Sequence, residues 1–73
     1  MARVERLSQR IGRQIRERRE GARFSQLALA ERANLSLNHI SLIERGQRLP
    51  RLETLQRVAR ALGADVGELV QRP

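Results

Sequence analysis

The sequence predicts an all-α fold, a bundle of five short helices. Apolar residues recur at helical spacing along the whole chain, and no stretch alternates between apolar and polar residues as a strand would. Residues that cap or end helices separate the apolar segments at short intervals. The 73 residues are enough for one small core. We therefore expect a single domain over residues 1–73, with its packed part at about 7–70.

The first helix is predicted over residues 4–21. Leu7, Ile11 and Ile15 recur at steps of four, which places them on one face of a helix. Arginines occupy most of the other faces. This helix should therefore pack its apolar face on the core and expose a basic surface.

The second helix is predicted over residues 26–33. Ser25 is suited to cap its N-terminus, because a serine hydroxyl accepts a hydrogen bond from an N–H group of the first turn. Its inward face is narrow and consists of Leu29, Ala30 and Ala33. Asn34 follows, and asparagine tolerates the left-handed conformation that a tight turn requires.

The third helix is predicted over residues 37–45, only a few residues further on. Ser36 is suited to cap it, and Gly46 is suited to end it. Ile40 and Ile43 are three residues apart and should form its buried pair. The second and third helices together read as a helix-turn-helix unit.

Pro50 disfavours helix in the residue before it, so the fourth helix is predicted over residues 51–62. Its apolar face consists of Leu52, Leu55, Val58, Ala59 and Leu62. Asp65 and Glu68 have the spacing of a capping box, which predicts a fifth helix over residues 66–71. The apolar residues of this last helix are Val66, Leu69 and Val70.

The charge of the chain favours a polyanionic partner. Fifteen arginines and no lysine face eight acidic residues, for a net charge of +7. A surplus of this kind on a small domain is typical of nucleic-acid binding, and arginine can pair with phosphate and with guanine through two hydrogen bonds. Phe24 is the only aromatic residue. Because single strands are usually bound by stacking on aromatic side chains, duplex DNA is favoured.

Other classes of protein are disfavoured by what the sequence lacks. It has no cysteine and a single histidine, so we expect no disulfide, no metal site and no cofactor. It has no apolar run of ~20 residues and no signal peptide, so we expect no membrane insertion and a cytoplasmic location. It offers no pair of nucleophile and base and no phosphate-binding glycine loop, so we expect no catalytic residues and no enzyme.

Several motifs occur in a fixed order along the chain. They are IRERRE (15–20), FSQLALAERA (24–33), LS (35–36), HISLIERGQRLP (39–50) and LETLQRVARALG (52–63). In these motifs and their spacing the chain resembles a Cro/CI-type helix-turn-helix domain, also called lambda-repressor-like or XRE. The resemblance covers about residues 7–70. It implies a five-helix bundle whose third helix reads the major groove of DNA.

With the isoleucines of the third helix buried, its outward positions become the candidate base-reading residues Leu37, Asn38, Ser41 and Leu42. Asn38 is the best candidate, because its amide can pair with adenine through two hydrogen bonds. Ser41 could bond to a base or to a phosphate. Leu37 and Leu42 depart from the polar residues common in the family. They could contact a thymine methyl group or pack on another protein.

The resemblance also implies phosphate contacts and one structural ion pair. Gln26, at the start of the second helix, corresponds to a family residue that contacts the DNA backbone, and the helix N-terminus itself attracts phosphate. The full set of candidate phosphate contacts is Arg19, Ser25, Gln26, Ser36, His39, Arg45, Gln47 and Arg48. Arg19 and Glu44 match family positions that often form an ion pair, which we expect to hold the fold together.

One departure from the family pattern lies in residues 21–24, GARF. The family usually has glycine immediately before the SQ motif and its preceding apolar residue, where this chain has Arg23. We expect Gly21 to end the first helix in its place.

The leading functional hypothesis is a sequence-specific regulator of transcription that binds duplex DNA. A homodimer on a palindromic operator is expected, with half-sites ~34 Å apart. The candidate dimer residues are Leu49, Leu52, Val66 and Val70. A stand-alone repressor, a restriction–modification controller and an antitoxin all fit this class, and no domain that binds a small-molecule ligand is expected.

The alternative is a module of the same fold that binds a protein, such as an antitoxin or a partner-controlled regulator. An exposed patch of Leu27, Leu37 and Leu42 would favour it. A basic amphipathic membrane binder is less favoured, because aromatic anchors are missing and the caps define a compact bundle.

Overall fold

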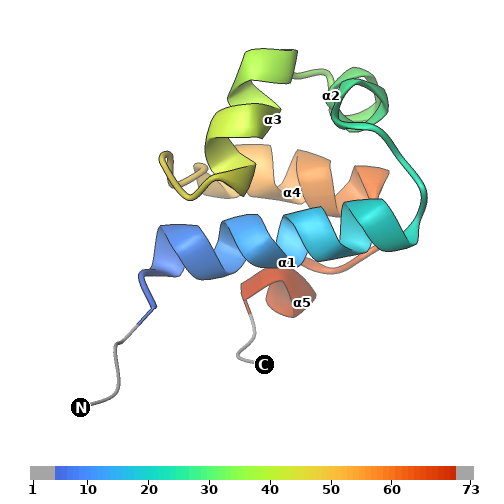
Figure 1. Ribbon diagram of the computed structural model, residues 1–73. Helices are drawn as coiled ribbons and strands as arrows, with labels where there is room; N and C mark the ends of the chain where they lie inside the picture. The colour runs from blue at the N-terminus through green and yellow to red at the C-terminus, as the bar shows by residue number, and fades with distance from the viewer. Residues whose placement is uncertain (1–4, 71–73) are drawn as a thin grey trace.

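The computed structural model describes residues 5–70, and this range contains five helices and no strand. The helices are α1 (Leu7–Gly21), α2 (Gln26–Ala33), α3 (Leu37–Glu44), α4 (Leu52–Ala61) and α5 (Val66–Val70) (Figure 1). The predicted all-α, five-helix fold is confirmed. The predicted boundaries differ from the observed ones by one residue at most, except at the start of α1; residue 71 lies outside the described range.

The prediction that the first helix starts at residue 4 is wrong in its described part, because α1 begins at Leu7. Residue 4 itself lies outside the described range. Arg6 has an extended backbone, with φ −65° and ψ 148°, and its N–H group donates to Oε1 of Gln9 at 3.3 Å. Leu7 therefore lies in the first turn and remains 44% exposed, whereas Ile11 and Ile15 are buried.

One core joins all five helices. Figure 1 shows α2 and α3 on one side of α1 and α4, and α5 on the other side of α1. The buried apolar residues are Ile11, Ile15, Leu29, Ala30, Ala33, Ile40, Ile43, Leu55, Val58, Ala59 and Leu69. Leu52 was expected on the apolar face of the fourth helix, but it is 64% exposed because it occupies the first position of α4, beyond the edge of the core.

Gly12 allows α1 to lie directly against the end of α3. A Cβ atom at this position would lie 2.3 Å from the carbonyl oxygen of Ile43 and 2.8 Å from that of Glu44. Both atoms are backbone atoms, so they have little room to move away. The backbone of α1 therefore sets the position of the C-terminal end of α3.

The helix caps around α2 and α3 follow the prediction. The N–H of Ala28 donates to Oγ of Ser25, and the N–H of His39 donates to Oγ of Ser36, both at 3.0 Å. Asn34 has φ 58° in the turn between the two helices. These contacts mark where α2 begins, where it ends and where α3 begins.

The first helix ends at Gly21, as predicted, but the left-handed residue of the turn that follows was not predicted. Gly21 is the last residue of the helix and does not adopt positive φ; Arg23 does, with φ 63°. The N–H groups of Ala22, Arg23 and Phe24 donate to carbonyl groups in the last turn of α1. The chain therefore reverses through a left-handed arginine rather than through the glycine.

Candidate nucleic-acid interface

α3 presents one narrow face to the outside of the molecule. An α-helix has 3.6 residues per turn, and the buried Ile40, Ile43 and Glu44 mark its inward side. The four predicted base-reading residues lie within one outward arc: Leu37, Asn38, Ser41 and Leu42. Asn38 is exposed, Leu37 is 46% exposed, and Ser41 and Leu42 are half-buried.

A buried carboxylate fixes one edge of α3. The side chain of Glu44 is 2% exposed, and it accepts hydrogen bonds from Arg19 on α1 and from Gln26 on α2. Nε and Nη2 of Arg19 lie 2.6 Å and 3.0 Å from its two carboxylate oxygens, and Nε2 of Gln26 lies 3.0 Å from Oε1. Three helices therefore meet at one carboxylate.

The third nitrogen of the Arg19 guanidinium, Nη1, also stabilises the fold. It donates to the carbonyl oxygen of Phe24 at 2.8 Å, which holds the loop before α2. The hydrogen bond from Arg19 to Glu44 raises the pKa of the Arg19 guanidinium, so this group stays charged. Burial opposes the shift, but the paired carboxylate dominates. The structure thus brings together the two residues expected to form an ion pair.

A hollow of about 330 Å³ lies beside this cluster, at the N-terminus of α2 and the end of α3. Two arginines of α1 and the arginine just after α3 border it; the lining residues are Arg16, Arg19, Glu20, Gln26, Glu44 and Arg45. The side chain of Arg16 lies 3.6 Å from that of Glu20. The hollow therefore combines a helix N-terminus with surplus positive charge, an arrangement that attracts phosphate.

A second hollow of about 330 Å³ lies along the opposite edge of α3, next to the start of α4. Its lining residues are His39, Arg48, Leu49, Pro50, Arg51 and Thr54. Burial lowers the pKa of His39, and the positive charges of Arg48 and Arg57 lower it further. The neutral imidazole is therefore favoured in the free protein.

The other predicted phosphate contacts lie around the same helices. Oγ of Ser25 and Oγ of Ser36 each accept a capping hydrogen bond, and both residues remain exposed. Nε of Arg45 donates to the carbonyl oxygen of Ser41 at 3.3 Å, while Gln47 and Arg48 are exposed in the segment after α3.

The predicted dimer residues form two pairs with different exposure. Leu49 and Leu52 are 53% and 64% exposed, next to the start of α4. Val66 and Val70 on α5 are half-buried and pack against the core. α5 lies on the opposite side of α1 from α3 (Figure 1), so the valines are remote from the base-reading residues.

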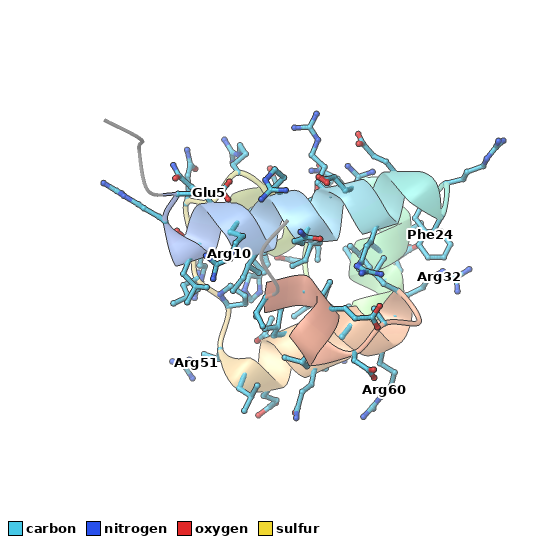
Figure 2. The ribbon with its side chains drawn as sticks, turned by 90° about the horizontal axis from the view of Figure 1, so that it is seen from below. Glu5, Arg10, Phe24, Arg32, Arg51 and Arg60 are labelled. Atoms are coloured by element: carbon cyan, nitrogen blue, oxygen red, sulfur yellow. The ribbon has the colours of Figure 1, made fainter. Side chains whose placement is uncertain are left out.

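The sequence prediction missed Arg16, Arg51 and Thr54, which line the two hollows. Figure 2 shows Arg51 and Arg60 at opposite ends of α4. Of these two arginines, Arg51 is the one that lines the second hollow. Helical spacing could have placed Thr54 three residues after Arg51 on one face of α4. Nothing in the sequence distinguishes Arg16 from the other arginines of α1.

Two other features were sought in the part of the chain that the structure describes, a metal site and a membrane-spanning helix. Among residues 5–70, no three side chains that commonly bind metals come together. No helix within the described range has the length and apolarity needed to cross a membrane.

Comparison with known proteins also identifies a helix-turn-helix in this chain. A family model described as helix-turn-helix matches residues 15–69. The chain is 42% identical over 60 residues to an immunity repressor protein of Bacillus phage phi105, an alignment that covers 82% of this chain and 42% of the repressor. The chain spans less than half the length of the curated relatives it matches.

Two solved structures extend the likeness to three dimensions. The restriction–modification controller protein C.AhdI from Aeromonas hydrophila superposes with a TM-score of 0.83 at 32% identity, covering 85% of this chain and 94% of that protein. The P22 c2 repressor, solved in complex with a synthetic operator, superposes with a TM-score of 0.79 at 31% identity, covering 84% of this chain and 92% of that one. The family match and these superpositions together place this chain in the Cro/CI-type helix-turn-helix family.

Proposed function

We propose that this chain is a sequence-specific transcription regulator that binds a palindromic duplex operator as a homodimer. The observation that carries the proposal is the outward face of α3, which exposes Asn38 between two arginine-lined hollows. A helix in the major groove has base edges in front of it and a phosphate strand on each side. The similarity to the P22 c2 repressor, which was solved with an operator, supports this reading.

In this proposal α3 is the recognition helix. Asn38 pairs with adenine through its amide, and Ser41 donates to a base or to a phosphate oxygen. Leu37 and Leu42 contact thymine methyl groups. Because these two leucines offer no hydrogen bonds, most of the base discrimination depends on Asn38.

Phosphate contacts come from both edges of the recognition helix. On one edge, the side-chain amide of Gln26 donates one hydrogen bond to Glu44, and its second N–H donates to the DNA backbone. The N-terminus of α2 lies at the same edge and attracts the same phosphate. Arg45 and the exposed Ser25 lie beside it. On the other edge, the candidate contacts are Ser36, His39, Gln47 and Arg48. Arg19 acts mainly through Glu44, because its described hydrogen bonds go to that residue and to Phe24.

A homodimer would give the domain enough contacts for specific binding. One recognition helix covers only a few base pairs, and dimers of this fold place two such helices in half-sites about one helical turn apart. The exposed Leu49 and Leu52 are the apolar surface that we assign to the interface, with Val66 and Val70 at its border.

Selection of binding sites from a random duplex pool tests the proposal. We expect one enriched sequence with two-fold symmetry and half-sites ~34 Å apart. Affinity for that sequence should fall steeply with salt, because each phosphate neutralised adds about −0.9 to the slope of log K against log salt. Replacing Arg48 with Gln should make this slope shallower by about 1 at an unchanged sequence preference. Enrichment of no sequence at all would overturn the proposal.

A second candidate function is a protein-interaction module. Leu27 and Leu37 are 53% and 46% exposed and lie at the starts of α2 and α3, where a partner could cover them. The salt dependence separates the two functions, because a module with no DNA contacts has no steep salt slope on duplex DNA.

A further inference from the structure

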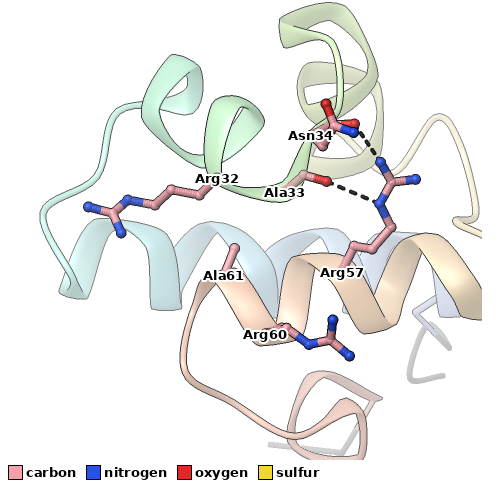
Figure 3. A pocket seen from close by; sticks show the side chains of 6 residues that line it. All are labelled: Arg32, Ala33, Asn34, Arg57, Arg60 and Ala61. Atoms are coloured by element: carbon pink, nitrogen blue, oxygen red, sulfur yellow. Dashed lines mark hydrogen bonds between the residues drawn. The ribbon is translucent and has the colours of Figure 1, made fainter.

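Arg57 joins α4 to the turn of the helix-turn-helix. Its Nε donates to the carbonyl oxygen of Ala33 at 3.2 Å, and its Nη2 donates to that of Asn34 at 2.6 Å (Figure 3). Ala33 is the last residue of α2, and Asn34 is the left-handed residue after it. One side chain therefore holds the two consecutive carbonyl groups at which the chain leaves α2.

These two carbonyl groups lie in the turn from which α3 starts. The last carbonyl groups of a helix have no partner within the helix and need one from elsewhere. Ser36 caps α3 only two residues after Asn34, so a small rotation of the Asn34 peptide turns the whole of α3. The N–H of Leu35 and the carbonyl group of Asn34 belong to one peptide group. Its N–H donates to the carbonyl oxygen of Ala30 at 2.8 Å and its oxygen accepts from Arg57, so this peptide is held at both ends.

The hollow beside Arg57 is not arranged to hold an anion. It has a volume of about 420 Å³, and Arg32 and Arg60 also border it. In Figure 3 the guanidinium group of Arg32 points away from that of Arg57, and the guanidinium group of Arg60 lies below it, apart from the two carbonyl groups. The guanidinium of Arg32 lies 4.4 Å from the centre of the Phe24 ring instead. The three charges therefore do not converge on one point, and the specific contacts of Arg57 are the two carbonyl groups.

We propose that Arg57 is a positioning residue for sequence discrimination: its guanidinium sets the angle between α2 and the recognition helix. This inference rests on the proposed function. A guanidinium is a planar group with donors at fixed angles, so it can hold both carbonyl oxygens at once. The ammonium group of lysine keeps the charge but has no such fixed fork. Arginine and lysine should therefore differ at this position even though their charge is the same.

The test compares Arg57→Lys and Arg57→Gln with the wild type on the selected operator and on a random duplex of equal length. Arg60→Gln is the matched control, since Arg60 lies on the same helix, is exposed and carries the same charge. Both Arg57 variants should lower the ratio of operator affinity to random-duplex affinity by roughly tenfold, because the loss of one charge-assisted hydrogen bond is of that size. Arg60→Gln should leave the ratio unchanged. All measurements are made at a temperature at which circular dichroism shows each variant folded.

Three outcomes would overturn the inference. If Arg57→Lys keeps the wild-type ratio, charge alone explains the residue. If Arg57→Gln lowers both affinities equally and reduces the salt slope by about 1, then Arg57 is a phosphate contact. If the variants melt at a lower temperature but keep the wild-type ratio when folded, then the role of Arg57 is structural only. A wild-type protein that itself shows no sequence preference contradicts the proposed function, which separates that failure from the other three.

Discussion

Asn38 is the residue on which the proposed base reading depends. It is the exposed amide on the outward face of α3, where its neighbours on the same face are a serine and two leucines. Asn38→Ala should relax the preference at one base pair of each half-site and weaken operator binding by about 1–3 kcal/mol. Repeating the random-pool selection with this variant checks the expectation. An unchanged preference at every position would show that Asn38 is not the base reader.

Gly12 should be intolerant of even a methyl group. Because an added Cβ would lie 2.3 Å from the carbonyl oxygen of Ile43, Gly12→Ala should push α1 away from α3 and destabilise the fold by about 1–3 kcal/mol. Gly21→Ala is the control, since no atom lies within 4 Å of the added Cβ there. Alanine at that helical position should be neutral or stabilising by about 0.5–1 kcal/mol. Urea denaturation of both variants measures the difference, and equal effects would contradict this account of α1 packing.

His39 should make stability depend on pH. Burial, with the charges of Arg48 and Arg57, lowers its pKa below the ordinary value of 6.5, so the folded protein binds the proton less readily than the unfolded chain does. The free energy of unfolding should therefore rise with pH from the lowered pKa up to about 6.5, and fall as the protein is acidified through this range. The hydrogen bond from Arg13 lowers the pKa of Glu5 as well, so that carboxylate favours the folded state at a pH above its ordinary pKa of 4.5.

The measurement is chemical denaturation at a series of pH values, for the wild type and for His39→Gln. The glutamine variant should lose the pH dependence of its unfolding free energy between these pH values, because a glutamine side chain does not titrate. The same slope in both proteins would assign the effect to another group.

At the scale of the elements, the loop between α1 and α2 contains an unusual backbone conformation. Arg23 has φ 63°, which costs a non-glycine residue roughly 1–2 kcal/mol. Arg23→Gly should therefore raise the melting temperature, although the greater freedom of glycine in the unfolded chain reduces the gain. Asn34→Gly, in the α2–α3 turn at φ 58°, should gain less, because asparagine tolerates this region. A lower melting temperature for Arg23→Gly would mean that the arginine side chain stabilises the fold by more than its backbone strain destabilises it.

The elements around α3 are held by contacts distant in sequence. Glu44 binds residues of α1 and α2, and Gly12 receives the end of α3. Removing one partner of a buried, paired charge leaves the other unpaired, which is costly. α3 is therefore positioned mainly by its neighbours, since eight residues alone are too few to form a stable helix in water.

At the scale of the whole molecule, the dimer proposal depends on exposed leucines. Leu52→Glu should leave the fold intact, because the side chain is 64% exposed, but a charge there should prevent association. Sedimentation equilibrium should then show a monomer where the wild type shows a dimer, and operator affinity should fall. Leu27→Glu, on a leucine of α2 that is 53% exposed, should leave the mass unchanged. A wild-type monomer at high micromolar concentration, with or without operator, would contradict the proposed dimer.

The sequence by itself determined the class of fold and most of the helix boundaries. Helical periodicity, the serine caps and the left-handed Asn34 are local properties, because each depends on residues within a few positions of one another. The start of α1 was predicted wrongly, and the left-handed backbone of Arg23, just after the predicted and observed end at Gly21, was not foreseen. In both places the decisive contacts are backbone hydrogen bonds and side-chain bonds that residue preference alone does not reveal.

The candidate surface on α3 could also be predicted, because burial of Ile40 and Ile43 fixes which residues face outward. Among the contacts that hold that surface in place, the Arg19–Glu44 pair could be predicted only from the family resemblance, and only the tertiary structure revealed those of Gly12 and Arg57. Arg57 is 23 residues from Asn34, and Arg19 is 25 residues from Glu44. In a chain with fifteen arginines, no local pattern shows which ones meet a carbonyl or a carboxylate and which remain exposed. That selection depends on how the helices pack, since packing brings distant residues within hydrogen-bonding distance.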